Sequence, residues 1–413
     1  MNQDSKITAS VSSTYAQNHW DCAIALFRQR QSLLAASEMD AAVVARIEMT
    51  LRVHLHVLAR SDWSEPHADK AAPVFVSLAR RLSSPDPEMR QEGTARACSL
   101  LSDGGEMGKG AFVALTLLPP EDNARLLDLY RDHHGLRAQL FDLWREQGRR
   151  VPTGLLNRAE LQGRDEALQE AALAYAASRP EIGVAVFHPY YRGLLSGSAS
   201  PCSGRLTAQA LWGALVRGEQ DVAPALRRAV EQEAEPQTRF ALLRLAALKA
   251  DREVLPVLRR LLTERPAQGA RLLALHGSLE AVDMLVEALF DPATMDAAAR
   301  AWPWISAQAL PHKARLQVVG AEGGQGLMPD GEVARAWWAQ QRSALSPQDR
   351  LLFGAPLSRS RLQALALRKA GDAGRDLLDL LALSLQRPLG VSAHAEQAQR
   401  RACLYNLAES RER

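Results

Sequence analysis

The chain has 413 residues, 47% of them hydrophobic, and carries 50 basic and 47 acidic side chains, a formal net charge of +3 at pH 7. An apolar fraction of this size excludes wholesale disorder, and the near-balanced charge lacks the basic excess that phosphate-binding surfaces normally show. The four cysteines are far apart in the sequence and form no CxxC pair, which argues against a disulfide framework and against a zinc site.

The composition favours helix nearly everywhere, because Ala, Leu, Arg, Glu and Gln heavily outnumber the residues that favour strands. Residues 1–14 are predicted to be flexible, and residues 15–65 are predicted to form a helical hairpin. The N-terminal segment lacks the apolar core of a signal peptide, and no apolar run approaches the ~20 residues needed to span a bilayer. We therefore expect a soluble, cytoplasmic protein.

Internal repetition indicates the architecture of residues 66–317. The segments 213–230, 246–262 and 273–290 each run from the end of an Ala/Leu-rich helix, through a polar turn, into a second amphipathic helix. They follow one another at spacings of 32 and 28 residues, which suits a helix–turn–helix repeat. One such unit cannot cover its own apolar face, so the units are predicted to stack into a HEAT-like solenoid.

An earlier unit is predicted at residues 73–101, where Asp86 and Arg90 stand on either side of a short stretch that begins with proline. Glu235 and Arg239 have the same spacing in the central repeats. We predict that the two acidic side chains cap the second helix of their unit, and that the two arginines bridge neighbouring repeats.

Two breaks interrupt the pattern. Residues 187–205 are rich in Gly, Pro and Ser and are predicted to form an irregular loop. Residues 318–332 form the second break, after the repeats, and they open a predicted C-terminal helical cap at 318–413. Tyr190 and Tyr191 lie near the start of the first break, where they are either exposed anchors for a partner or part of the core.

The chain carries no recognisable catalytic constellation. None of its ten histidines precedes a glutamate, unlike the His-Glu pairs of HEAT-repeat di-iron hydroxylases, and no glycine-rich phosphate loop is present. His54 and His56 fall on opposite sides of a helix and cannot chelate one ion together. Ser196 and Cys202 have only His188 near them in the sequence as a base. We predict a non-enzymatic protein without catalytic, metal-binding or cofactor-binding residues.

Aligned arginine pairs recur in the repeats, at 80–81, 227–228 and 259–260. They indicate either a salt-bridged, solvated face or a surface for nucleic acid, as on DNA glycosylases built from HEAT-like repeats. The candidate partner-binding residues are Tyr190, Tyr191, Arg192, Arg227, Arg228, Arg259 and Arg260.

Trp337 and Trp338 are adjacent in a chain in which aromatic residues make up 5%. Neighbouring residues on a helix point about 100° apart, so both side chains are buried together only at a crowded junction. We predict that they belong to the core where the repeats meet the C-terminal cap, and an aromatic protein-binding hot spot is the alternative.

The segment "LMPDGEVARAWWAQQRSALSPQDRLLFGAPLSRSRLQALALRKAG" resembles the C-terminal signature of a bacterial helical-repeat family encoded in type VI secretion gene clusters. The stretch "HWDCAIALFRQRQSLLAA" is similar to the opening hairpin of that family. The resemblance implies a cellular setting and no reaction. Its structural signature residues here are Trp337, Trp338, Arg350, Gly354 and Pro356. Gly354 and Pro356 are expected in a turn between two helices, and Arg350 near a helix C-terminus, where its charge is favoured.

These observations predict an all-α protein: an N-terminal helical hairpin, a HEAT-like solenoid and a C-terminal helical cap. The leading functional hypothesis is a non-catalytic scaffold or accessory protein of type VI secretion that binds an effector, spike or tip component before loading. One alternative is an immunity protein that neutralises a cognate toxin. The other is a nucleic-acid-binding protein or DNA glycosylase on a HEAT scaffold.

Overall fold

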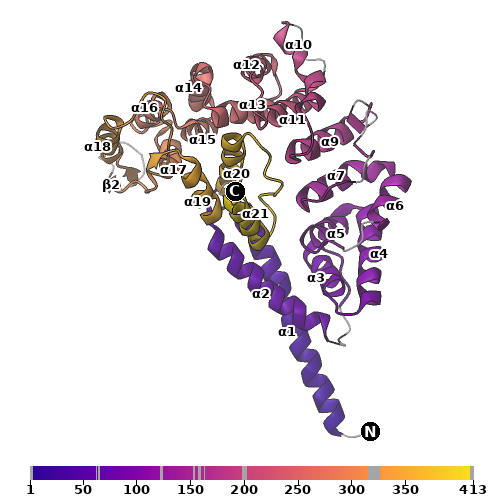
Figure 1. Ribbon diagram of the computed structural model, residues 1–413. Coiled ribbons are helices and arrows are strands. Elements are labelled where there is room, and N and C mark those ends of the chain that lie inside the picture. Colours follow the sequence, from indigo (N-terminus) through magenta and orange to yellow (C-terminus); the bar gives the residue numbers. More distant parts are fainter. Residues whose placement is uncertain are drawn as a thin grey trace. The chain divides into compact units, whose positions relative to one another are not determined.

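The computed structural model shows an all-α protein in which the only strands among the described residues are very short (Figure 1). The described residues are 3–61, 63, 66–120, 124–151, 154–156, 160–161, 163–197, 202–314 and 326–409. The predicted breaks at 187–205 and 318–332 therefore lie partly outside them.

The chain divides into two compact units. Unit 1 comprises Met1–Gly183, Gln363–Leu378 and Pro388–Arg413, and unit 2 comprises Val184–Leu362 and Asp379–Arg387. This division differs from the predicted one in its C-terminal part, because residues 318–413 do not form a unit of their own. Parts of that segment pack on the N-terminal hairpin, 300 residues or more away in sequence.

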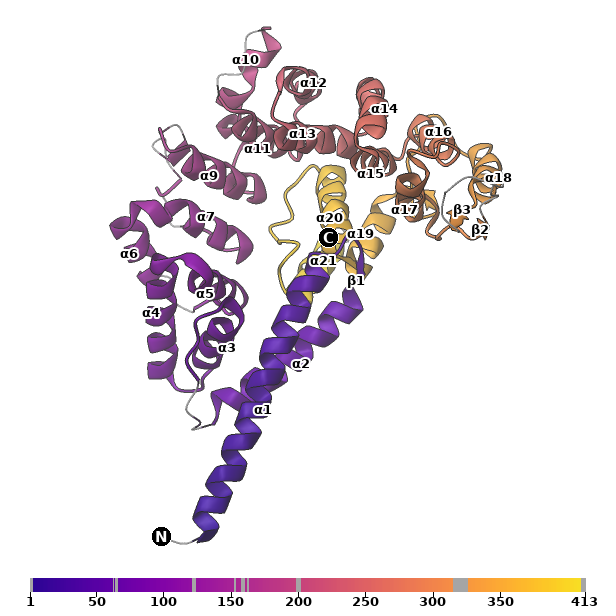
Figure 2. The same cartoon turned by 180° about the vertical axis from the view of Figure 1, so that it is seen from behind.

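Unit 1 opens with the predicted helical hairpin, formed by α1 (Gln3–Leu34) and α2 (Ala41–Ala59), which lie side by side in both views (Figures 1 and 2). The backbone of residues 3–14 belongs to α1, where a flexible segment is predicted. Phe27 of α1 stacks on Phe75 of α3 (Ala71–Leu82) with ring centroids 4.2 Å apart, which joins the hairpin to the helices that follow.

The helices after the hairpin bury a shared aromatic and aliphatic core. Phe141 contacts both Trp144 and Tyr175 edge-on or tilted, and all three side chains are almost completely buried. Large buried rings of this kind contribute much of the apolar area that holds helices together. These helices are α3 (Ala71–Leu82), α4 (Pro87–Asp103), α5 (Gly105–Leu117), α6 (Ala124–Asp132), η1 (His134–Leu136), α7 (Arg137–Glu146) and α9 (Glu166–Ser178).

Unit 2 contains the central repeats as successive helix pairs, as the sequence predicts. The first helices of successive pairs pack on one another, and the second helix of a pair packs on the first helix of the next pair. The pairs are α11 (Gly204–Leu215) with α12 (Val222–Gln232), α13 (Pro236–Lys249) with α14 (Leu255–Glu264), and α15 (Pro266–His276) with α16 (Leu279–Ala288). The shorter elements of this part are η2 (Val184–Val186), η3 (His188–Tyr190), α10 (Arg192–Leu195) and η4 (Arg252–Val254).

Helix caps explain why the repeats turn where they do. Asp86 accepts a hydrogen bond from the backbone N–H of Glu88 at the start of α4, and Glu235 accepts from Gln237 and Thr238 at the start of α13. A side-chain acceptor satisfies N–H groups that have no partner in the first turn of a helix. Both acids cap a helix as predicted, but Glu235 caps α13, the first helix of its pair, where the second helix is predicted.

Arginines join consecutive repeats through ion pairs. Arg227 on α12 donates two hydrogen bonds to Asp251, at 2.7 and 2.9 Å, and Arg259 on α14 reaches Glu287 on α16 at 3.3 Å. In the pairs 227–228 and 259–260, the first arginine thus contacts an acid from the next repeat. The salt-bridged interpretation of these two positions is confirmed.

The C-terminal side of unit 2 continues with α17 (Met295–Ser306), the strand pair β2 (His312–Ala314) and β3 (Leu327–Pro329), and α18 (Gly331–Arg342). A tight hairpin follows, formed by β4 (Leu351–Leu352) and β5 (Ala355–Pro356). Gly354 lies in its turn with φ of +84°, and a Cβ there would stand 3.0 Å from the carbonyl oxygen of Ser306. Glycine is therefore the residue that fits this turn.

Arg350, just before this hairpin, binds the ends of two helices. Its guanidinium donates to the carbonyl oxygens of Ala247 and Leu248 at the end of α13, and of Leu275 and His276 at the end of α15, at 2.8–3.2 Å. Cations are favoured at helix C-termini, where the last carbonyls have no partner within the helix. Burial lowers the pKa of Arg350 to about 10, still far above neutral pH. The expected position near a helix C-terminus is confirmed.

The C-terminal segments in unit 1 close the hairpin at its turn. β1 (Met39–Asp40) pairs with β6 (Lys369–Ala370), which joins α19 (Arg359–Arg368) to α20 (Gly371–Leu385). Gly371 has φ of +70°, and a Cβ there would stand 2.2 Å from the carbonyl oxygen of Ala36. Any other residue at this position would push the turn away from α20.

The segment before α21 (Gln397–Glu409) is held by charged groups of unit 1. Ser392 donates a short hydrogen bond to Glu146 of α7, and His394 lies 3.8 Å from the same carboxylate. Burial opposes ionisation of Glu146, but the neighbouring His394, the charge of Arg145 and the hydrogen bond from Ser392 outweigh it and lower its pKa to about 2.

The Glu146 contact predicts a pH-dependent contribution to stability. Because the folded pKa is depressed, ionised Glu146 stabilises the native state above its ordinary pKa of 4.5, and this contribution is lost as the pH falls from there towards 2. Denaturation of wild type and Glu146→Gln should therefore differ at pH 6 and converge near about pH 2. An equal difference at both pH values would contradict this assignment.

Candidate functional site

A pocket of about 160 Å³ lies in unit 2 between α13 and α14, beside the turns that precede α13 and α15. Phe240, Leu243, Val257 and Leu261 give it apolar walls. Small apolar hollows with a few polar groups at the edge are the usual form of binding sites for side chains. We call this hollow the arginine pocket, after the residues described next.

Three arginines line this pocket: Arg239 of α13, Arg260 of α14, and Arg265 at the start of α15. Within the part of the chain that the structure describes, none of the three guanidinium groups has a hydrogen-bond acceptor or an ion-pair partner. Glu264 is the acid among the lining residues. The pocket therefore has an excess of positive charge that the protein itself does not neutralise.

The glutamates of the turn before α13 do not change this balance by pairing with the arginines. Glu235 accepts from two N–H groups of α13, and Glu233 accepts from the backbone N–H of Glu235 at 2.7 Å. The hydrogen bonds from Thr238 and the neighbouring N–H groups lower the pKa of Glu235, so this carboxylate is ionised and engaged by the helix.

Two buried polar atoms of the pocket have no partner among the described residues. Nε of Arg239 is a hydrogen-bond donor, and Oε1 of Gln268 is an acceptor. Buried polar atoms in proteins are almost always hydrogen-bonded, so an unpaired donor and acceptor in one pocket call for a ligand or water. A peptide backbone offers both complementary groups, C=O for Arg239 and N–H for Gln268.

The local sequence explains how Arg239 reaches the pocket. Glu235 caps α13, Pro236 occupies its first turn, and Arg239 follows one turn later. Arg239 is predicted to bridge repeats, and this prediction is wrong, because its guanidinium has no partner in the neighbouring repeat. In the sequence, the repeated acid–Pro–x–x–Arg pattern indicates where this arginine lies. The pattern does not indicate that the arginine is unpaired.

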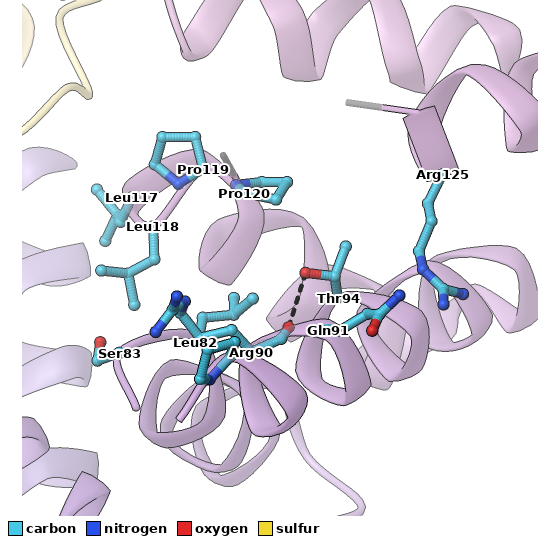
Figure 3. A pocket seen from close by; sticks show the side chains of 11 residues that line it. Leu82, Ser83, Arg90, Gln91, Thr94, Leu117, Leu118, Pro119, Pro120 and Arg125 are labelled. Atoms are coloured by element: carbon cyan, nitrogen blue, oxygen red, sulfur yellow. Dashed lines mark hydrogen bonds between the residues drawn. The ribbon is translucent and has the colours of Figure 1, made fainter. Parts of the chain in front are cut away.

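A second pocket, of about 520 Å³, lies in unit 1 and is lined by residues of the other acid–Pro–x–x–Arg segment (Figure 3). Here Asp86 caps α4, and Arg90 follows Pro87 by three residues, with Pro119 and Pro120 across the hollow. The Arg90 guanidinium donates to the carbonyl oxygens of Ser84 and Pro85, each at 2.9 Å. This arginine is already engaged, so the arginine pocket of unit 2 is the better candidate site.

The arginines predicted to bind a partner have different environments. Arg227 and Arg259 are in the ion pairs described above, and Arg228 donates to the carbonyl oxygens of Leu194 and Leu195. Arg192 is exposed at the start of α10. Arg260 alone among these five lines the arginine pocket.

The structure corrects the prediction that Tyr190 and Tyr191 contact a partner. Their side chains are 5% and 1% exposed, and burial raises the pKa of each to about 12. The reason is that the chain here does not form an open loop: η3 and α10 fold these rings inward, with Tyr191 edge-on to His188 at 6.0 Å. Buried rings cannot act as exposed anchors.

The paired tryptophans differ in burial. Trp338 is 4% exposed, and its Nε1 donates to Asp283 of α16 at 2.7 Å, so its predicted place in the core is confirmed. Trp337 is half-buried and meets Trp302 of α17 edge-on, with centroids 5.4 Å apart. The two rings pack on different helices, which joins α18 to both α16 and α17.

Neither a cluster of three metal-binding side chains nor a membrane-spanning helix occurs among the described residues. No group of three or more His, Cys, Asp or Glu side chains within them is placed to share one metal ion. Cys202 contacts Thr207 and the carbonyl oxygen of Tyr190, while the neighbouring residues 198–201 lie outside the described part. No helix of that part combines the length and apolarity that crossing a bilayer requires.

Comparison with known proteins gives no relative: no protein-family model matches the chain, and no curated protein matches it significantly.

Proposed function

We propose that the protein is a non-catalytic, helical-repeat binding protein that holds an acidic segment of a protein partner in the arginine pocket. The observation that carries this proposal is the group of three unpaired arginines around an apolar hollow. Arginine binds carboxylates through planar, bidentate hydrogen bonds and is enriched at the centre of protein interfaces. The matching ligand is a peptide with an apolar side chain between acidic ones.

The proposed setting is type VI secretion, where the partner would be an effector, spike or tip component bound in the cytoplasm before loading. Support for this setting comes from the sequence resemblance around Trp337, Trp338 and Arg350. An immunity protein that binds a cognate toxin would use the same pocket chemistry, and the identity of the partner distinguishes the two roles.

The nucleic-acid alternative has less support from the contacts. A phosphate-binding face needs several arginines directed to solvent, whereas Arg227, Arg228 and Arg259 are engaged within the protein. If the alternative held, binding to duplex DNA would fall steeply between low and moderate salt.

Charge reversal in the pocket tests the proposal. A short fluorescein-labelled peptide that places a leucine between glutamates should bind the wild type, and Arg260→Glu should weaken binding about tenfold or more, because attraction becomes repulsion. Arg300→Glu, an exposed change on α17 outside the pocket, is the matched control and should bind like the wild type. Fluorescence anisotropy measures all three.

Affinity purification from the native bacterium then identifies the natural partner. We expect wild type and Arg300→Glu to recover the same protein and Arg260→Glu to lose it. Equal recovery by Arg260→Glu, together with peptide binding unaffected by this change, would overturn the arginine pocket as the binding site.

A further inference from the structure

Two histidines from the N-terminal hairpin face each other across α1 and α2. Nδ1 of His19 lies 2.8 Å from Nδ1 of His54, and the ring centroids are 4.8 Å apart at an interplanar angle of 57°. Both side chains are half-buried and so open to solvent on one side. At this distance one nitrogen must carry a proton and the other must accept it, because two bare lone pairs or two N–H groups would repel.

Neighbouring groups act on each of the two rings. Burial lowers the pKa of His54, and the neighbouring His19 lowers it further. The ring of Tyr15 lies edge-on to His19 at 4.5 Å and restricts that imidazole. Two ring nitrogens that already lie side by side need little rearrangement to bind one ion.

The distance between the two Nδ1 atoms indicates which coordination geometry a metal ion bound by both would have. Two metal–nitrogen bonds of about 2.0 Å at a right angle place the nitrogens about 2.8 Å apart, whereas a tetrahedral angle requires about 3.3 Å. The observed 2.8 Å matches neighbouring positions of a square-planar or tetragonal ion. Such geometry with nitrogen and oxygen ligands is typical of Cu²⁺ and Ni²⁺, and Cu²⁺ binds more tightly.

We propose that His19 and His54 form a two-histidine site for Cu²⁺, with water in the remaining coordination positions. When the ion binds, the ring that carries the proton on Nδ1 releases it to solvent and takes up a proton at Nε2, so both imidazoles bind as neutral ligands and no change of oxidation state is involved. The ion bridges α1 to α2, so binding stabilises the hairpin by mass action.

This pair lies beyond what spacing in the sequence reveals. The two residues are 35 positions apart and come together only through the register of the hairpin. His56 lies two residues from His54 on the same helix, is exposed and is not part of the His19–His54 contact, so it serves as a matched control.

Titration of the tag-free, full-length protein with Cu²⁺ in a non-coordinating buffer tests the site. We expect one ion to bind the wild type, with binding at least tenfold weaker in His19→Ala and in His54→Ala and unchanged in His56→Ala. Electron paramagnetic resonance of the one-to-one complex should show hyperfine coupling to two nitrogens. Zn²⁺, which prefers tetrahedral ligands, should bind less tightly than Cu²⁺.

Thermal melting gives a readout that does not depend on the spectroscopy. Cu²⁺ should raise the melting temperature of the wild type and of His56→Ala and leave that of His54→Ala unchanged, while all three have similar helical content by circular dichroism. Wild-type binding that is equally strong in His54→Ala, or coupling to fewer than two nitrogens, would leave only a neutral histidine hydrogen bond and would overturn the metal site.

Discussion

Replacement of Glu48 by alanine is expected to lower the free energy of unfolding by about 3–5 kcal/mol, because it leaves a buried cation without its partner. Arg30 and Glu48 are 2% and 6% exposed, and Nε of Arg30 donates to Glu48 at 2.9 Å. The second carboxylate oxygen of Glu48 accepts from the backbone N–H of Gln397 at 2.8 Å, and Arg30 also donates to the carbonyl oxygen of His394. The pair therefore fixes the C-terminal segment onto α1 and α2.

Two comparisons separate the ion pair from simple loss of volume. Chemical denaturation should show that Arg30→Met combined with Glu48→Leu costs less than Glu48→Ala alone, because two apolar side chains need no counter-charge. Hydrogen exchange around residues 388–409 should become faster in Glu48→Ala. In the double variant it should stay slow if apolar packing replaces the lost hydrogen bonds. A double variant as unstable as the single one would contradict the argument from the unpaired charge.

Truncation of Trp338 to alanine is expected to destabilise the protein by about 3–5 kcal/mol, since a large side chain is removed from a closed site. The change also removes one of two donors from Asp283, whose other oxygen accepts from Arg342 at 2.7 Å. Trp337→Ala should cost less, because Trp337 is half-buried and contributes mainly its contact with Trp302.

Trp338→Phe keeps an aromatic ring in the site and removes the Nε1 hydrogen bond, so it should cost about 1–3 kcal/mol. Thermal melting should show the largest decrease in melting temperature for Trp338→Ala and smaller decreases for Trp338→Phe and Trp337→Ala. An unchanged melting temperature for both alanine variants would mean that α18 does not depend on this junction.

Local sequence predicted the repeats well. The boundaries of α13 and α15 follow from Pro236 and Pro266, which stop one helix and fit the first turn of the next. The caps at Asp86 and Glu235 follow from side-chain chemistry that acts within three residues. Such features depend on neighbours along the chain, so one sequence contains all the information that they need.

The candidate sites depend on contacts between distant segments. The sequence predicted Arg260 as a candidate binding residue, but it predicted Arg227 and Arg259 equally, because whether an arginine is paired depends on which acid the next repeat presents. Tyr190 and Tyr191 lie in a stretch with loop composition and are nevertheless buried. Burial is a property of the packed neighbourhood, and residue type alone does not report it.

Helical character, repeat spacing and caps were thus determined by the sequence itself, through periodicity and hydrogen bonds that reach only a few residues. Only the tertiary structure decided which arginines are left unpaired in the arginine pocket, that His19 meets His54, and that the C-terminal segment packs on Glu48 and Glu146. The physical reason is that charge pairing and burial are set by packing between segments up to 364 residues apart, and many registers of that packing are compatible with the same local pattern.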